Sequence, residues 1–216
     1  SIGHHYFIAN LTSKDIASSV ALAVNEKHGI WYNPMTGEYH EATIGDKGIQ
    51  LNLKSGESRI LITSNKPVNE WKLGSKVKVN EKEAIAAADS KTIDLTENAW
   101  KLSFTEDAPK VGETFNLKGV KSWEGLSEKA KVMMGTGVYE TTIKLSKDDA
   151  KKQWTIDLGD VRESARVYVN NKYIGCAWAV PYILNCKDAL NKGKNTIRIE
   201  VTNLPANRIA EMDRQG

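Results

Sequence analysis

Residues 158–207 decide the fold, with the sequence LGDVRESARVYVNNKYIGCAWAVPYILNCKDALNKGKNTIRIEVTNLPAN. Near its start, Ala165, Val167 and Val169 alternate with polar residues, and this period of two predicts a half-buried strand. Asn170-Asn171 then supplies two residues that tolerate positive φ, as a two-residue hairpin turn requires. The stretch therefore predicts a β-hairpin, whose return strand begins at Tyr173 and ends at Gly175.

A second alternating segment follows in the same stretch. Residues 192–195 form a predicted turn, and Ile197, Ile199 and Val201 then recur at every second position. The whole stretch reads as short strands joined by turns. It contains no obvious catalytic motif.

Bulk composition limits the function classes. Of the 216 residues, 40% are hydrophobic and 26% charged, which is typical of a globular protein, and the net charge is only +3. Lysines and acids are interleaved without a basic stripe, so we expect no nucleic-acid partner. No run of eighteen apolar residues occurs, so we expect no membrane span.

The first 65 residues predict a small β-sandwich. Five short segments have strand character and are separated by turn residues, namely 5–10, 19–24, 29–32, 48–53 and 58–63. Two sets of apolar residues are expected to face the core, namely Val20, Leu22 and Val24 on one segment and Ile49, Leu51 and Leu53 on another. Residues 66–91 are interpreted as a linker, with a short helical turn or a loop at 81–88.

Residues 92–216 predict a second all-β unit. Strands are expected at 92–95, 100–104 and 138–145, the last with Tyr139, Thr141, Ile143 and Leu145 on one face. Residues 122–131 predict one short helix that starts at Ser127. Helical periodicity is almost absent elsewhere, so the fold class is all-β.

Cysteine and histidine usage predicts no redox or metal framework. Cys176 and Cys186 allow one disulfide without requiring it, and two small buried thiols are the simpler interpretation. The four histidines have no metal-ligand spacing, and no CxxC or HExxH motif occurs. We therefore expect no cofactor.

Several motifs in the second unit carry a family resemblance through their shared order. They are Lys121-Ser122-Trp123, GTGVYETT at 135–142, LGDV at 158–161, ARVYVNNK at 165–172, Gly175 with Trp178 and Pro181, GKN at 193–195, VTN at 201–203 and ANRI at 206–209. In this order they resemble the galactose-binding-like jelly rolls of large glycoside hydrolases. Those include the sugar-binding domain of family 2 and the C-terminal domain of family 106 α-L-rhamnosidase-like enzymes of gut Bacteroidetes. Asn171 departs from the pattern, which usually has glycine there.

The first unit adds to this resemblance through YFIAN at 6–10 and WYNPMTG at 31–37. They are similar to the β-sandwich that follows the catalytic barrel in such enzymes. The resemblance implies a piece of a longer, Bacteroides-type polysaccharide-degrading enzyme that is periplasmic or secreted. It also implies that the catalytic barrel is missing and that a structural calcium ion is compatible with acid-rich turns such as Glu106-Asp107 and Asp148-Asp149.

Two functions remain open for such a fragment. It is expected to be a non-catalytic ancillary module that binds carbohydrate, or a purely structural module that supports the catalytic domain without a ligand of its own. Glycoside hydrolysis needs two carboxylates across one bond, and the sequence places no such pair in a cleft. The expected partner is therefore carbohydrate or the catalytic domain.

Aromatic residues in loops give the candidate sugar contacts, because sugars stack on aromatic faces and their hydroxyls need polar partners. The candidates are Trp123, Trp178 and Tyr182 as aromatic contacts, with Asn171 and Arg208 as hydroxyl partners. Trp71, Trp100 and Trp154 are expected in cores or domain contacts instead.

Overall fold

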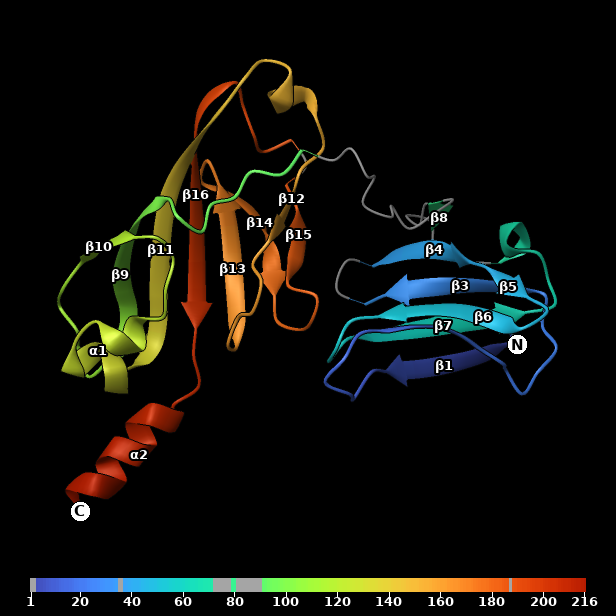
Figure 1. Ribbon diagram of the computed structural model, residues 1–216, viewed down its shortest axis with the longest axis horizontal. Helices are drawn as coiled ribbons and strands as arrows, with labels where there is room; N and C mark the ends of the chain where they lie inside the picture. The colour runs from blue at the N-terminus through green and yellow to red at the C-terminus, as the bar shows by residue number, and fades with distance from the viewer. Residues whose placement is uncertain (1–2, 35–36, 72–78, 81–90, 187) are drawn as a thin grey trace. The chain divides into compact units, whose positions relative to one another are not determined.

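The chain divides into two compact units, Ser1–Lys91 and Thr92–Gly216. The computed structural model describes residues 3–34, 37–71, 79–80, 91–186 and 188–216 (Figure 1). Most of the expected linker at 66–91, including the helical turn at 81–88, lies outside these described residues. Within the described part of that segment, Trp71 is buried and follows a short 3-10 turn.

Unit 1 is a sandwich of two antiparallel sheets with one short parallel edge (Figure 1). The larger sheet has the strand order β1-β7-β3-β4-β8 and the smaller sheet the order β2-β6-β5. The bounds are β1 His4–Ala9, β2 Ile16–Val20, β3 His28–Asn33, β4 Glu38–Ala42, β5 Ile44–Gly45, β6 Gly48–Leu53, β7 Ser58–Ser64, η1 Val68–Glu70 and β8 Val79–Asn80.

The core of unit 1 lies between its two sheets. Ile49, Leu51 and Leu53 of β6 pack in one cluster with Trp31 of β3 and Leu61 of β7. The alternation on β6 follows from its sequence, since every second residue is polar and points to solvent. The predicted core face of residues 48–53 is thus confirmed.

The predicted strand at 19–24 is partly wrong. The strand β2 covers Ile16–Val20, and residues 21–24 continue without strand structure. Val20 is 39% exposed at the end of this strand, whereas Leu22 packs against the core cluster. The apolar alternation of 20, 22 and 24 therefore continues past the point where the ladder with β6 ends at Val20–Ile49.

Unit 2 is built around a six-stranded sheet of order β10-β9-β11-β16-β13-β14, with a separate two-stranded sheet β12-β15 (Figure 1). The bounds of its strands are β9 Ala99–Ala108, β10 Phe115–Lys118, β11 Met134–Leu145, β12 Thr155–Asp157, β13 Ser164–Val169, β14 Lys172–Ala177, β15 Ile183–Asn185 and β16 Gly193–Thr202. The helical elements are η2 Trp123–Gly125, α1 Glu128–Val132, η3 Asp149–Lys151 and α2 Ala206–Gln215. All pairings in the large sheet are antiparallel.

The predicted hairpin forms the edge of the large sheet. Ala165, Val167 and Val169 are fully buried, and Asn170 and Asn171 have φ values of 51° and 64°. Positive φ at both turn residues matches the right-handed twist of the flanking strands. The return strand β14 continues through Gly175 to Ala177, so the predicted end at Gly175 is wrong.

The register explains why one face of the large sheet is apolar. Tyr139 on β11 lies opposite Ile199 on β16, which in turn lies opposite Val167 on β13. The same face carries Leu102 of β9, which pairs with Tyr139. This face is covered by a cluster around Trp100 and Trp123 at one side and by the segment containing β12 and β15 at the other.

Helices contribute little to either unit, and the predicted all-β fold is confirmed. The short helix α1 begins after Ser127, whose hydroxyl accepts a hydrogen bond from the Ala130 N–H at 3.2 Å, as predicted for its N-cap. The helix α2 was not predicted, and none of its residues is buried. The expected strand at 92–95 is absent, because residues 91–95 make no ladder.

Candidate functional site

The aromatic residue that the structure presents most openly in unit 2 is Trp178, which is 60% exposed. It directly follows β14, whose last residue Ala177 pairs with Ala165 near the start of β13. Its neighbours Ala179 to Tyr182 form the loop that leads into β15. We call residues 178–182 the Trp178 loop.

A second loop lies beside the Trp178 loop and carries the polar groups. Residues 158–163 precede β13, and the Leu158 N–H donates a hydrogen bond of 3.0 Å to the Tyr182 carbonyl oxygen. The two segments are thus tied together at this hydrogen bond and at the Ala165–Ala177 pair. We call residues 158–163 the Asp160 loop.

The Asp160 loop holds an exposed ion pair. Arg162 donates two hydrogen bonds to the Asp160 carboxylate, from Nε at 3.0 Å and from Nη2 at 2.8 Å. These hydrogen bonds and the opposite charge of the partner lower the pKa of Asp160 and raise the pKa of Arg162. The remaining N–H groups of Arg162 are further donors on the Asp160 loop, which adjoins the Trp178 loop.

The five predicted sugar contacts do not converge on one site. Trp178 and Tyr182 share the Trp178 loop, but Asn171 lies in the hairpin turn at the other end of β14. Five residue steps separate Lys172 from Ala177, which is about 17 Å of strand. Asn171 therefore cannot act on the same small ligand as Trp178.

Trp123 is not available to a ligand, and its prediction as a sugar contact is corrected. It is only 7% exposed, its ring stacks on Tyr139 with centroids 6.2 Å apart, and Phe104 meets it edge-on at 5.9 Å. The residue was predicted in a loop, but it begins the short 3-10 helix η2, and its ring lies in the core cluster of unit 2. Trp71 and Trp100 are also buried, as predicted.

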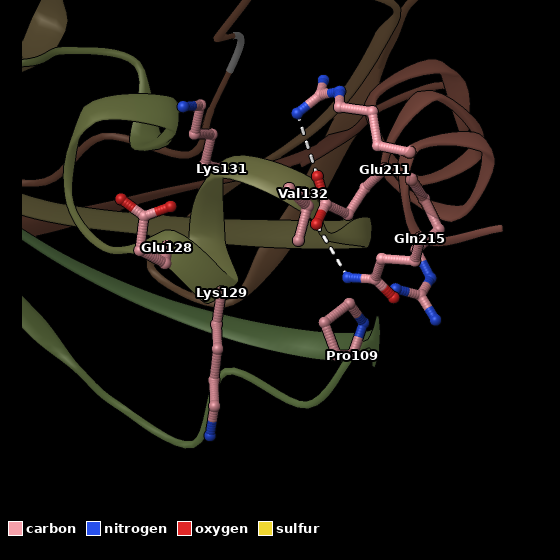
Figure 2. A pocket seen from close by; sticks show the side chains of 9 residues that line it. Pro109, Glu128, Lys129, Lys131, Val132, Glu211 and Gln215 are labelled. Atoms are coloured by element: carbon pink, nitrogen blue, oxygen red, sulfur yellow. Dashed lines mark hydrogen bonds and ion pairs between the residues drawn. The ribbon is translucent and has the colours of Figure 1, made fainter.

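Arg208 lies on α2 and lines a groove of about 250 Å³ between α1 and α2. Figure 2 shows this groove with Glu128, Lys129 and Lys131 on the α1 side and Glu211 and Gln215 on the α2 side. Glu211 accepts hydrogen bonds from Arg214 at 2.9 Å and Gln215 at 2.7 Å. The groove is smaller than a typical small-molecule pocket, and Arg208 belongs to it rather than to the Trp178 loop.

The acid-rich turns that suggested calcium are bound to protein groups. Asp149 accepts a hydrogen bond from the Ser146 hydroxyl at 2.8 Å and pairs with Lys152 at 3.1 Å. Asp107 accepts one from the Val111 N–H at 2.7 Å. Across the described ranges, no group of three or more histidine, cysteine or acidic side chains is arranged to hold a metal ion.

Both cysteines are free thiols. Cys176 pairs with Arg166 in the large sheet. Cys186 packs with Val169 and Ala189 against the opposite face of that sheet. Burial raises the pKa of Cys186 to about 11. Its thiol is therefore protonated and unreactive at neutral pH.

Asp160 and Arg162 were not predicted as ligand contacts, although the sequence holds the signal. Once residues 165 and 177 are paired in the hairpin, the residues before 165 must lie beside those after 177. The exposed Trp178 then has polar neighbours from an earlier loop.

No described helix is long and apolar enough to cross a membrane.

Comparison with known proteins shows which proteins this chain is similar to. Residues 125–216 match the family described as "Glycosyl hydrolase 2 galactose-binding domain-like". A curated protein of Formosa agariphila, named "Putative beta-glucuronidase", is 28% identical over 172 residues, which are 76% of this chain and 15% of that protein.

The fold comparison covers both units. A rhamnosidase from Novosphingobium sp. PP1Y has a TM-score of 0.70 and 21% identity, over 96% of this chain and 19% of the rhamnosidase chain. The chain thus spans less than a fifth of either relative. The predicted resemblance is confirmed: the chain is similar to glycoside hydrolases, and its second unit to their galactose-binding-like domain.

Proposed function

We propose that this chain is a non-catalytic, ancillary part of a longer glycoside hydrolase and that unit 2 contacts carbohydrate through the Trp178 loop. The family match of residues 125–216 supports a sugar-binding or ancillary role. The observation that carries the binding site is the exposure of Trp178 on a loop that adjoins the Asp160 loop with its ion pair.

The chemistry of this surface suits a sugar. An indole face can stack on the apolar side of a pyranose ring, and a carboxylate with a guanidinium can accept and donate hydrogen bonds to its hydroxyls. Trp178 is 60% exposed rather than enclosed, which fits an extended polysaccharide better than a small ligand that must be surrounded.

Calorimetric titration with oligosaccharides that contain rhamnose, galactose or arabinose tests this site. Trp178→Ala is expected to weaken binding about tenfold or more, which corresponds to about 1.4 kcal/mol. Tyr173→Ala is the matched control, because Tyr173 is an exposed aromatic residue of the same hairpin, outside both loops. Absence of binding at millimolar sugar, or equal loss in both variants, argues against the site.

The non-catalytic character of the chain is part of the proposal. The two carboxylates of the groove, Glu128 and Glu211, face several cations, and Glu211 is already held by Arg214 and Gln215. In the part of the chain that the structure describes, no ligand-sized cleft accompanies them. Assays of the chain on aryl glycosides are expected to show no turnover, and measurable hydrolysis would contradict this.

A second candidate function is structural support of a catalytic domain without any ligand. Exposed apolar residues around α2 favour it, since Leu204, Ile209 and Met212 are each more than half exposed. We also propose a periplasmic or secreted location on the basis of the family resemblance. Fractionation of cells that produce the full-length polypeptide tests the location.

A further inference from the structure

Unit 1 has a second apolar face, on the side of its larger sheet that points away from the core. Trp31 and Leu61 point into the core, so their neighbours along β3 and β7 point outward. We call this surface the outer face of unit 1. Its centre is formed by Phe7, Ile30, Tyr32, Tyr39, Ile60 and Ile62.

Four of these side chains form one row across four neighbouring strands. Phe7 on β1 pairs with Ile60 on β7, Ile60 pairs with Tyr32 on β3, and Tyr32 pairs with Tyr39 on β4. The two tyrosine rings have their centroids 4.6 Å apart. With neighbouring strands about 4.8 Å apart, the row is roughly 14 Å long.

One part of the outer face is already covered within unit 1. Ile30 is fully buried although the register points it outward. The 3-10 turn η1 contacts β3, and Trp71 at its end is itself buried, with its indole N–H bound to the Lys66 carbonyl at 2.8 Å. Phe7, at the other end of the face, is 74% exposed, and the four other residues of the face, Tyr32, Tyr39, Ile60 and Ile62, are half-buried.

An antiparallel sheet that faces water normally carries polar residues on that side. The six central residues of the outer face are instead aliphatic or aromatic. A second row runs across the same strands through Ile62 and Ile30, and the exposed polar residues at its two ends are His5 and Glu41. An apolar centre with a polar rim is typical of a protein interface. A sugar is less suited, because Ile60 occupies the middle of the row and offers neither a stacking face nor a hydrogen bond.

We propose that the outer face of unit 1 is the surface on which another folded domain of the same, longer polypeptide docks. The proposal rests on the proposed function, which makes this chain part of a larger glycoside hydrolase. The chain spans 15% of the curated relative and 19% of the rhamnosidase, so most of each relative lies outside the matched part. A further domain in the same polypeptide is therefore the occupant that the known lengths favour.

Cysteine labelling tests the proposal in the full-length polypeptide, produced from the complete reading frame. Cys176→Ser and Cys186→Ala remove the native thiols, and Phe7→Cys then places one thiol on the outer face. Leu11→Cys, at a residue that is 92% exposed and lies outside the outer face, is the matched control. Both positions are exposed, so neither substitution threatens the fold, and Tyr39→Cys gives a second position on the same row.

We expect a maleimide to label position 7 about tenfold more slowly in the full-length polypeptide than in the 216-residue chain, while position 11 reacts equally in both. Equal labelling of position 7 in both proteins overturns the proposal. Protection of position 7 in the 216-residue chain also overturns it. If that protection rises with concentration, the cover is a second copy of the chain, and if it does not, the cover comes from the chain itself.

The outcome is separable from that of the proposed function. Sugar titration measures binding at the Trp178 loop, whereas the labelling rate measures only the accessibility of the outer face. Loss of sugar binding with protection of position 7 leaves the docking surface standing. Hydrolase activity of the full-length polypeptide with an unprotected position 7 removes only the docking surface.

Discussion

Trp123 and Gly137 are in direct contact, and the six-membered ring of the indole fills the space where any other residue at position 137 would carry its Cβ. Gly137 lies on β11 between Phe104 of β9 and Val201 of β16, so the ring rests on the sheet at a point without a side chain. This contact explains how Trp123 becomes part of the core. It also makes the glycine a requirement of the fold.

Gly137→Ala is therefore expected to destabilise unit 2. The added methyl group overlaps a rigid indole that is already in contact with Tyr139 and Phe104, and overpacking of this kind costs about 1–3 kcal/mol. Urea unfolding monitored by tryptophan fluorescence measures the change. Gly125→Ala is the control, because a methyl group added there would have open space for 4 Å around it, and it should stay within about 0.5 kcal/mol of the wild type.

The two asparagines of the hairpin turn should respond oppositely to glycine. Asn170 donates to the Ala189 carbonyl at 2.8 Å and to Asn195 Oδ1 at 2.7 Å, and it accepts from the Thr196 N–H at 3.0 Å. Asn170→Gly should lower the free energy of unfolding by about 1–3 kcal/mol, because buried partners lose their hydrogen bonds.

Asn171 has a similar positive φ but is exposed. Asn171→Gly should leave the free energy of unfolding unchanged or raise it by up to about 1 kcal/mol, because glycine adopts this conformation without strain. Thermal unfolding of both variants side by side measures the difference. A larger loss from Asn171→Gly than from Asn170→Gly would contradict the role given to the Asn170 side chain.

Ser127 should be worth a measurable part of the stability of unit 2. Its hydroxyl caps α1 by accepting from the Ala130 N–H, and Ala130 itself is fully buried in the core cluster. Ser127→Ala should cost about 0.5–2 kcal/mol, whereas Ser127→Asp retains an acceptor and should cost less. Denaturant titration of the pair decides, and equal losses would show that the cap is unimportant.

Cys186 should make unit 2 sensitive to alkaline pH. Burial raises the pKa of its thiol to about 11, while a thiol in the unfolded chain has a pKa of about 8.5. A raised folded-state pKa gives stability that is fully present below pH 8.5 and is lost as the pH rises toward 11.

Between pH 8 and pH 10, the wild type should therefore lose about 1–2 kcal/mol more than Cys186→Ala. The comparison of slopes matters here, because Cys186→Ala also removes packing and lowers stability at every pH. Unfolding free energies measured at several pH values give both slopes. Parallel slopes would show that the thiol does not titrate between the two states.

Much of the fold could be predicted from local patterns. Ala165, Val167 and Val169 are buried because the period of two and the turn at Asn170 agree on the same register. α1 begins after Ser127 because the Ser127 hydroxyl accepts a hydrogen bond from a free N–H group in the first turn of the helix. This signal is local in the chain. Such elements need no knowledge of distant residues.

The predictions that were wrong or missing concern residues whose surroundings depend on segments distant in sequence, or elements that show no clear local pattern. The burial of Trp123 depends on the bare backbone at Gly137, which only the sheet register reveals. The helix α2 spans only ten residues, too few for the spacing of Ile209 and Met212 to stand out as a helical period, and both side chains are exposed. Asn171 and Arg208 are polar residues near glycosidase-like motifs, and the structure separates them from Trp178.

The position of β16 has a consequence for how unit 2 is made. It is the last strand in sequence, yet it lies in the interior of the sheet, paired with β11 on one side and β13 on the other (Figure 1). Until residues 193–202 leave the ribosome, the sheet exists only as two unconnected parts, β10-β9-β11 and β13-β14, each with an open edge. In unit 1, all strands except the short edge strand β8 have been synthesised once β7 is complete. Unit 1 should therefore fold on the ribosome before unit 2, whose sheet is incomplete until β16 has been synthesised.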